Sequence, residues 1–162
     1  MNPAAGGIFL YFYFCRSAET MKYTYDYPRA SLTVDAVVFR RKMEDCEVLL
    51  IRRGREPFKG QWALPGGFIE MDETLEQSVV RELEEETGLR LSGLKQLHAF
   101  SALDRDPRGR TISVVFWGFL EDERPVSAGD DASQAAWFSL KSLPELAFDH
   151  AQVIDMASRK CR

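Results

Sequence analysis

The sequence has little cysteine, no apolar run long enough to span a bilayer and no excess of basic charge. Its three cysteines, Cys15, Cys46 and Cys161, are scattered and odd in number, and their spacing suits neither a zinc site nor a set of disulfides. We therefore predict incidental thiols in a reducing, cytoplasmic setting. The net charge of −4 argues against a nucleic-acid partner, although local arginines can still hold small phosphates.

The first residues differ from the rest of the chain. Residues 4–15 (AAGGIFLYFYFC) are nearly all apolar, but they are too few to cross a membrane and no basic segment precedes them. We predict that residues 1–22 are a non-essential extension, such as an over-long start assignment would produce. An additional edge strand and an uncleaved anchor are the alternatives. Residues 23–162 are predicted to form one domain, with no membrane partner.

Alternating apolar and β-branched residues predict strands over residues 32–39, 47–51, 94–103, 111–120 and 134–140. The strongest helix begins after Thr74, which can form a capping box with Gln77, and ends at Gly88. A closing helix is expected over residues 148–160, with Asp149 as its cap. Strands on both sides of a helix, with a second helix at the end, predict an α/β fold with a mixed sheet between helices.

Four glutamates crowd the end of the first helix, where the helix dipole is negative. Residues spaced by three and four share a helix face, so Glu82, Glu85 and Glu86 project together and Glu84 points away. Like charges in this position oppose helix stability, and such conflicts are typical of functional sites. Three convergent carboxylates suit Mg²⁺, with Mn²⁺ as a second possibility. The alternative is a solvated acidic face.

The segment around these glutamates follows a fixed spacing. Gly67 is followed after five residues by Glu73 and after seven more by the run RELEEETGL, residues 81–89. This pattern resembles the Nudix box, and the order of elements from about Ala30 to Lys160 is similar to the family's α/β/α sandwich. The resemblance implies metal binding by Glu82, Glu85, Glu86 and the Gly66 carbonyl, and a catalytic set of Glu73, Arg81, Glu82, Glu85 and Glu86, in which Glu73 and Arg81 orient the helix.

The chemistry that the resemblance implies is hydrolysis of a diphosphate linkage. The metal ions would neutralise phosphate oxygens and lower the pKa of the attacking water. A general base is also required. A glutamate of the box is one candidate, and Asp130 or Asp131 of a later loop is a weaker one, because each fits better as part of a polar turn before a strand.

Residues outside the box bear on the substrate. The candidate contacts are Arg53, Phe58, Trp62, Arg105, Arg108 and Arg110. Arginines can bind phosphate bidentately and aromatic rings can stack on a base. Alternatively, Trp62 belongs to the core and the arginines form a solvated turn. These segments look similar to the ADP-ribose pyrophosphatase branch, which releases AMP and ribose 5-phosphate.

Three functions stay open at this stage. Besides ADP-ribose hydrolysis, the same box would serve a triphosphatase that acts on oxidised nucleotides, or a non-catalytic ADP-ribose sensor. Related regulators carry a winged-helix domain after the Nudix domain and often lose box residues. Here the sequence ends at Arg162 with the box intact, which favours the enzyme. We also expect a small-molecule nucleotide partner and a possible homodimer, with the apolar N-terminal run as a candidate interface strand.

Overall fold

The computed structural model describes residues 24–121, 124–129 and 132–161. Its elements in chain order are β1 (Ser31–Lys42), β2 (Asp45–Arg53), β3 (Trp62–Ala63), β4 (Gly66–Phe68), α1 (Leu75–Thr87), β5 (Lys95–Phe100), β6 (Thr111–Phe119), β7 (Ala132–Ser139) and α2 (His150–Ser158). They confirm every predicted strand and both helices, although β5 is shorter than the predicted 94–103. The predicted extension, residues 1–22, lies outside the described residues.

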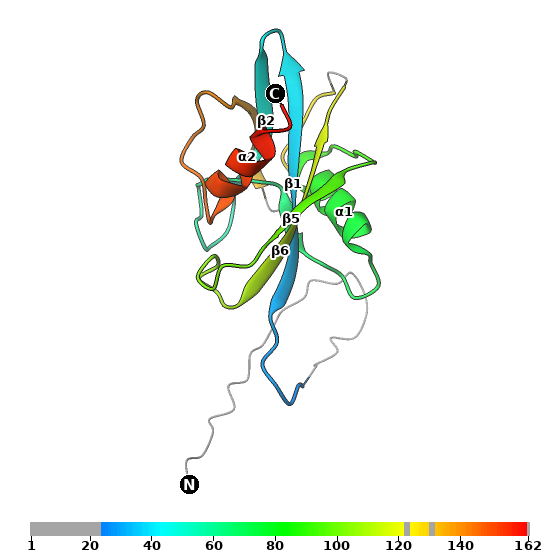
Figure 1. Cartoon of the computed structure of the whole chain (residues 1–162), viewed down its shortest axis with the longest axis vertical. Helices are drawn as coiled ribbons and strands as arrows, with labels where there is room; N and C mark the ends of the chain where they lie inside the picture. Colours follow the sequence, from blue (N-terminus) through cyan, green and yellow to red (C-terminus); the bar gives the residue numbers. More distant parts are fainter. Residues whose placement is uncertain (1–23, 122–123, 130–131, 162) are drawn as a thin grey trace.

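A mixed sheet forms the centre of the fold, with α1 on one side and α2 on the other (Figure 1). The strand order is β3-β2-β1-β6-β5, with β4 added beside β1 and β7 beside β2. β1 runs parallel to β6, whereas the other pairs are antiparallel. No helix of the described segments has the length and apolar character needed to cross a membrane.

Alternation along β1 divides the core into two layers. Val34, Ala36 and Val38 pack in the cluster that contains Val79 and Leu83 of α1. Val37 and Phe39 face the opposite cluster, which contains Val153 and Ile154 of α2 among its members. Because successive side chains of a strand point to opposite faces, one buried strand supports both helices. The arrangement confirms the predicted α/β/α sandwich.

β1 changes its partner along one edge. Its C-terminal half pairs with β2 from Phe39 to Lys42, and its N-terminal half pairs with β4 from Thr33 to Asp35. The fork between β2 and β4 contains the segment Leu64–Gly67, which we call the metal loop because the predicted carbonyl ligand belongs to it. The sheet therefore places this loop beside the centre of β1 and ahead of α1.

Both ends of α1 are closed as predicted. The Thr74 hydroxyl accepts a hydrogen bond from the Gln77 backbone N–H, and the Gln77 side chain accepts one from the Thr74 N–H. Gly88 ends the helix in the left-handed conformation at φ 69°, and its N–H donates to the Glu84 carbonyl. The caps set the two ends of α1. A residue with a side chain would be strained at Gly88, so the helix stops directly after its acidic run.

Asp149 occupies the N-cap position of α2, as predicted, but its side chain makes no capping hydrogen bond. Its two carboxylate oxygens instead accept hydrogen bonds from Arg105, at 2.8 and 3.0 Å. A long-range ion pair has replaced the local interaction that the sequence suggested.

The prediction of incidental thiols was also wrong for two of the three cysteines. Cys46, at the start of β2, and Cys161, after α2, form a disulfide with their Cα atoms 6.6 Å apart. The two residues are separated by 115 positions, so sequence spacing gave no signal for the pair. The bond links the C-terminus of the helical layer to the sheet.

We expect thiol titration of the unreduced, unfolded protein to detect one thiol, and titration after reduction to detect three. Reduction should lower the free energy of unfolding by about 4 kcal/mol, because the crosslink restricts a long loop in the unfolded chain. Urea denaturation with and without dithiothreitol measures this difference. Cys15→Ser is the control and should leave it unchanged. Three reactive thiols before reduction would contradict the pairing.

Candidate active site

Arg81 is the centre of the ion-pair network on α1. Its Nε donates to Glu73 at 2.8 Å, and one terminal nitrogen donates to Glu82 at 2.7 Å and to Glu85 at 3.3 Å. The other terminal nitrogen donates to the Phe68 carbonyl at 3.2 Å. A single guanidinium thus connects three carboxylates to the strand that follows the metal loop.

Glu73 is held from two sides. Burial tends to raise its pKa, but hydrogen bonds from Arg81 and from the buried Ser78 hydroxyl outweigh that effect, so the pKa lies below its ordinary value. A carboxylate that stays ionised over the physiological range keeps Arg81 in place. This geometry fits the orienting role that the family resemblance implies for the pair.

Glu82 and Glu86 are carboxylates in a desolvated environment. Burial raises the pKa of Glu82. It also raises the pKa of Glu86 to about 8, although the Gly66 N–H donates a hydrogen bond to the carboxylate at 2.9 Å. Glu85 is more exposed, with 61% of its side chain accessible. Glu84 points to solvent and pairs with Arg90, as helix geometry predicted.

The metal loop approaches its neighbours too closely for side chains. A Cβ on Gly66 would lie 2.2 Å from the Val34 carbonyl oxygen, and a Cβ on Gly67 would lie 2.5 Å from the Glu82 carboxylate. The backbone can therefore reach the carboxylates only because both positions are glycine. This close approach is the local reason for the Gly66–Gly67 pair.

The donor set fits a hard divalent cation in its chemistry. Carboxylates and a backbone carbonyl are the ligands that Mg²⁺ and Mn²⁺ prefer. A cation would also offset the cost of ionising the buried Glu82 and Glu86 side chains. Within the described part of the chain, however, no three acidic, histidine or cysteine side chains are gathered as a metal cluster. Glu82 and Glu85 are bonded to Arg81, and Glu86 is bonded to Gly66. Cation binding would replace some of these contacts.

Two arginines and three aromatic rings lie next to the carboxylates. The Arg53 guanidinium lies 4.9 Å from the centroid of the Phe148 ring, and that of Arg108 lies 5.3 Å from Phe68 and 5.9 Å from Phe148. Phe58 packs edge-on against Phe148 at 4.8 Å. Together these five residues form what we call the arginine–aromatic cluster.

The arginine–aromatic cluster interacts electrostatically with the α1 carboxylates. The pKa of Arg53 is lowered, first by burial and next by repulsion from Arg108. Attraction to Glu86, Asp106 and Asp35 acts in the opposite direction. Two cations that repel each other beside the α1 carboxylates form a region where an anionic ligand would be stabilised.

The other predicted substrate contacts are separated by the structure. Arg105 is buried and both of its bonded nitrogens face Asp149. Arg110 is exposed and donates to the carbonyls of Ser101 and Ala102. Trp62 packs edge-on against Phe138 in the α2-side core. Of the six candidates, only Arg53, Phe58 and Arg108 come together. Asp130 and Asp131, the weaker base candidates, lie outside the described residues.

Several residues near the site were missed by sequence reasoning. Phe68 belongs to the arginine–aromatic cluster, and Asp106 holds Arg108 by side-chain and backbone hydrogen bonds. Asp35 is buried beside Gly66 on β1. A single carboxylate inside the apolar run VDAVVF is a usable signal, whereas nothing local marks Phe68.

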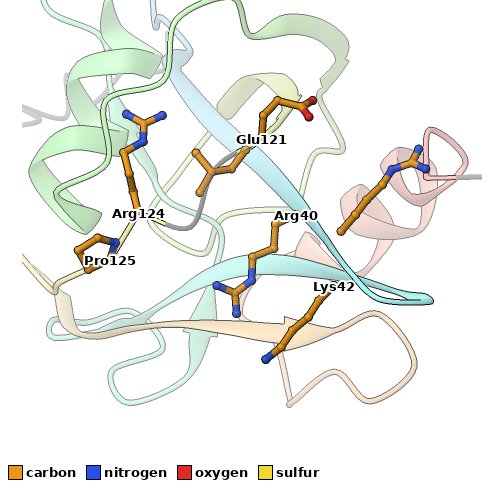
Figure 2. Close-up of a pocket in the computed structure, with 7 residues that line it drawn as sticks. Arg40, Lys42, Glu121, Arg124 and Pro125 are labelled. Carbon is orange, nitrogen blue, oxygen red and sulfur yellow. The ribbon is translucent and has the colours of Figure 1, made fainter.

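A separate hollow lies at the far end of β1. Arg40, Arg41, Lys42, Leu120, Glu121, Arg124 and Pro125 line it. In Figure 2 the cationic ends of Arg40 and Lys42 point to one side and that of Arg124 points to the other, and Arg40 is paired with Glu47 at 2.6 Å. The cations do not converge on one point, so this hollow is not the candidate substrate site.

A sandwich that presents a glutamate-rich helix behind a glycine loop defines a class of phosphoanhydride hydrolases. The NUDIX domain family model matches residues 30–157. The chain belongs to the Nudix family. It is 46% identical over 129 residues to an ADP-ribose pyrophosphatase of Methanocaldococcus jannaschii, covering 79% of this chain and 73% of that protein. By this homology the chain is a Nudix pyrophosphatase.

Solved structures give the same assignment. The NUDIX domain of Shewanella oneidensis NrtR, complexed with ADP ribose, has a TM-score of 0.79 at 35% identity, over 84% of this chain and 91% of that one. A bifunctional NMN adenylyltransferase/ADP ribose pyrophosphatase from Francisella tularensis, complexed with AMP and a manganese ion, has a TM-score of 0.74 at 34% identity. That match covers 85% of this chain and 44% of that one.

Proposed function

We propose that this protein hydrolyses the diphosphate of ADP-ribose to AMP and ribose 5-phosphate, with Mg²⁺ or Mn²⁺. The observation that carries the proposal is the position of the Arg53–Arg108 pair beside Glu86, flanked by Phe58, Phe68 and Phe148. Cationic and aromatic side chains grouped in this way suit a ligand that has both a diphosphate and an aromatic base. The similarity to an ADP-ribose pyrophosphatase and to an ADP-ribose-bound domain supports the same substrate.

The residues of α1 would hold the cation. We assign Glu82, Glu85, Glu86 and the Gly66 carbonyl as ligands, with Glu73 and Arg81 orienting the helix. A bound cation would lower the pKa of the attacking water and neutralise phosphate charge. Arg53 and Arg108 would stabilise charge on the phosphates as the linkage breaks.

The general base has two candidate sources. Glu86 is a buried box carboxylate whose pKa is raised to about 8 in the metal-free protein. Asp130 and Asp131 are the other candidates, because Gly129, which precedes them, donates its N–H to the Glu86 carbonyl at 3.2 Å. The described part of this loop therefore lies against the carboxylate end of α1.

A substrate panel tests the proposal. Purified protein with Mg²⁺ should convert ADP-ribose to AMP and ribose 5-phosphate, resolved by chromatography, faster than it hydrolyses oxidised or ordinary nucleoside triphosphates. EDTA should stop the reaction. Rapid triphosphate hydrolysis without ADP-ribose turnover would replace the proposal by the triphosphatase alternative.

Arg108 and Arg110 of the β5–β6 turn provide a matched pair. Arg108→Ala should raise the KM for ADP-ribose by about 10- to 100-fold, because charged hydrogen bonds to a phosphate contribute about 1.5–3 kcal/mol. Arg110→Ala removes the same charge from the same turn, but among the described residues the Arg110 side chain donates only to backbone carbonyls, so its KM should change less than twofold. Equal effects of the two variants would show that net charge alone matters.

The sensor alternative has one supporting observation, which is the similarity to the NrtR domain. A sensor would bind ADP-ribose without turning it over, so calorimetric binding combined with absent product would favour it. The domain boundary at residue 23, the cytoplasmic location, the lack of a nucleic-acid partner and the homodimer stay predictions.

A further inference from the structure

A buried polar network lies behind the metal loop. Its members are Asp35 on β1, Arg105 in the β5–β6 turn, Ser113 on β6, and Asp149 and His150 at the start of α2, and all five are largely buried. We infer that His150 is a positioning residue that holds the metal loop in place, and that the Arg105–Asp149 pair holds His150. The inference deepens the proposed function and rests on its metal site.

Three successive residues of the metal loop are fixed by three different elements. The Leu64 N–H donates to Nδ1 of His150 at 2.9 Å, which ties the loop to α2. The Pro65 carbonyl accepts from the Ala36 N–H of β1 at 2.8 Å. The Gly66 N–H donates to Glu86 of α1 at 2.9 Å. Within this triple attachment, the His150 contact is the only one of the three made by a side chain outside the Nudix box and outside the sheet.

The protonation state of His150 agrees with this role. A ring nitrogen that accepts a hydrogen bond carries no proton, so the neutral tautomer has its proton on Nε2. Burial lowers the pKa of His150, which favours the neutral ring. Nε2 faces Asp35 Oδ1 at 3.8 Å, and the other Asp35 oxygen accepts a short hydrogen bond from the Ser113 hydroxyl.

The start of α2 is itself held rigidly. Arg105 donates two hydrogen bonds to Asp149, and the two side chains are 4% and 10% exposed. The Arg105 Nη2, which donates to Asp149 Oδ1, also lies 3.8 Å from Asp35 Oδ2. A bidentate pair in a desolvated site has few alternative arrangements, so the helix start, and with it the His150 ring, has a defined position.

Phe148, which precedes Asp149, belongs to the arginine–aromatic cluster. Phe148 adopts φ 55° although it is not glycine, and such a conformation persists only where the surroundings enforce it. Its ring contacts Arg53, Phe58 and His150. Residues 148–150 therefore link the arginine–aromatic cluster to the metal loop. Loss of the His150 acceptor would leave the buried Leu64 N–H without a hydrogen bond.

The test compares isosteres at one position. His150→Asn keeps an acceptor where Nδ1 stands, His150→Gln places its oxygen nearer the position of Nε2, and His150→Ala removes the acceptor. We expect Mn²⁺ affinity, measured without substrate by electron paramagnetic resonance, to fall about 10- to 100-fold in His150→Ala and His150→Gln and to be largely kept in His150→Asn. Amide hydrogen exchange at Leu64 should accelerate in His150→Ala and His150→Gln and stay close to the wild-type rate in His150→Asn.

The other histidine of the sequence supplies the control. His98 lies exposed on β5, so His98→Ala should change neither readout. Wild-type Mn²⁺ affinity and Leu64 exchange in folded His150→Gln would overturn the inference. Absence of Mn²⁺ binding in the wild-type protein would refute the proposed metal site instead. Leu64 exchange would then decide the positioning role alone: unchanged exchange in the Gln and Ala variants overturns it, and accelerated exchange supports it.

Discussion

Glu86→Gln should lower the turnover of ADP-ribose by about 10²- to 10³-fold, the size of effect seen when one electrostatic contact to a transition state is lost. The substitution keeps the shape of the side chain and the hydrogen bond from the Gly66 N–H, but it removes the charge that a cation needs. We expect kcat to carry most of the loss. Steady-state kinetics at saturating Mg²⁺, with circular dichroism to verify the fold, measures it.

Glu84→Gln is the matched control. Glu84 is on the same helix two residues earlier, exposed and paired only with Arg90 among the contacts described. Its replacement should leave kcat within a factor of two. Near-wild-type, Mg²⁺-dependent turnover by Glu86→Gln would remove Glu86 from the ligand set, and an equal loss in both variants would point to the net charge of the helix.

The metal-free protein should lose stability as pH rises from about 5 to 9. Burial raises the pKa of Glu86 from 4.5 to about 8 in the folded state. Between these values folded Glu86 keeps a proton that the unfolded chain has released, so the contribution of Glu86 to stability is greatest below pH 4.5 and declines until pH 8 is passed. The expected loss is about 3–5 kcal/mol, and burial of Glu82 acts in the same direction.

Urea denaturation in EDTA at several pH values tests this slope. Glu86→Gln should flatten it, Glu84→Gln should leave it unchanged, and Mg²⁺ should reverse it because the cation binds the ionised carboxylates. Glu73 and Asp106 have lowered pKa values, so their contributions are nearly complete at pH 5. Burial lowers the pKa of His150, which adds stability as pH rises toward 6.5 and is common to the wild-type protein and the variants. Equal slopes in the wild-type protein and Glu86→Gln would show that Glu86 ionises normally.

Much of the fold could be predicted because its signals are local. The capping box at Thr74, the left-handed stop at Gly88 and the period-two pattern of β1 each involve only nearby residues. The face shared by Glu82, Glu85 and Glu86 followed in the same way from helix geometry. These features do not depend on what packs against them.

The errors and omissions concern contacts between distant segments. Asp149 has the residue type of a cap, but Arg105, 44 positions away, competes for its carboxylate. Cys46 and Cys161 meet only because α2 returns over β2. The turn that contains Arg105, Arg108 and Arg110 reads as one basic patch, yet its three side chains end in three environments. Local composition cannot distinguish these outcomes, because they depend on which elements become neighbours.

The placement of the working parts along the chain has a consequence for how this protein could be altered. The proposed metal ligands and the pair that orients α1 all lie between Gly66 and Glu86, whereas the arginine–aromatic cluster draws on distant segments that contain Arg53, Arg108 and Phe148. Laboratory evolution could therefore change ligand choice by exchanging those outer segments while the proposed metal ligands stay unchanged. Exchange of a segment that includes His150 would also disturb the metal loop, so residue 150 limits which segments can be exchanged.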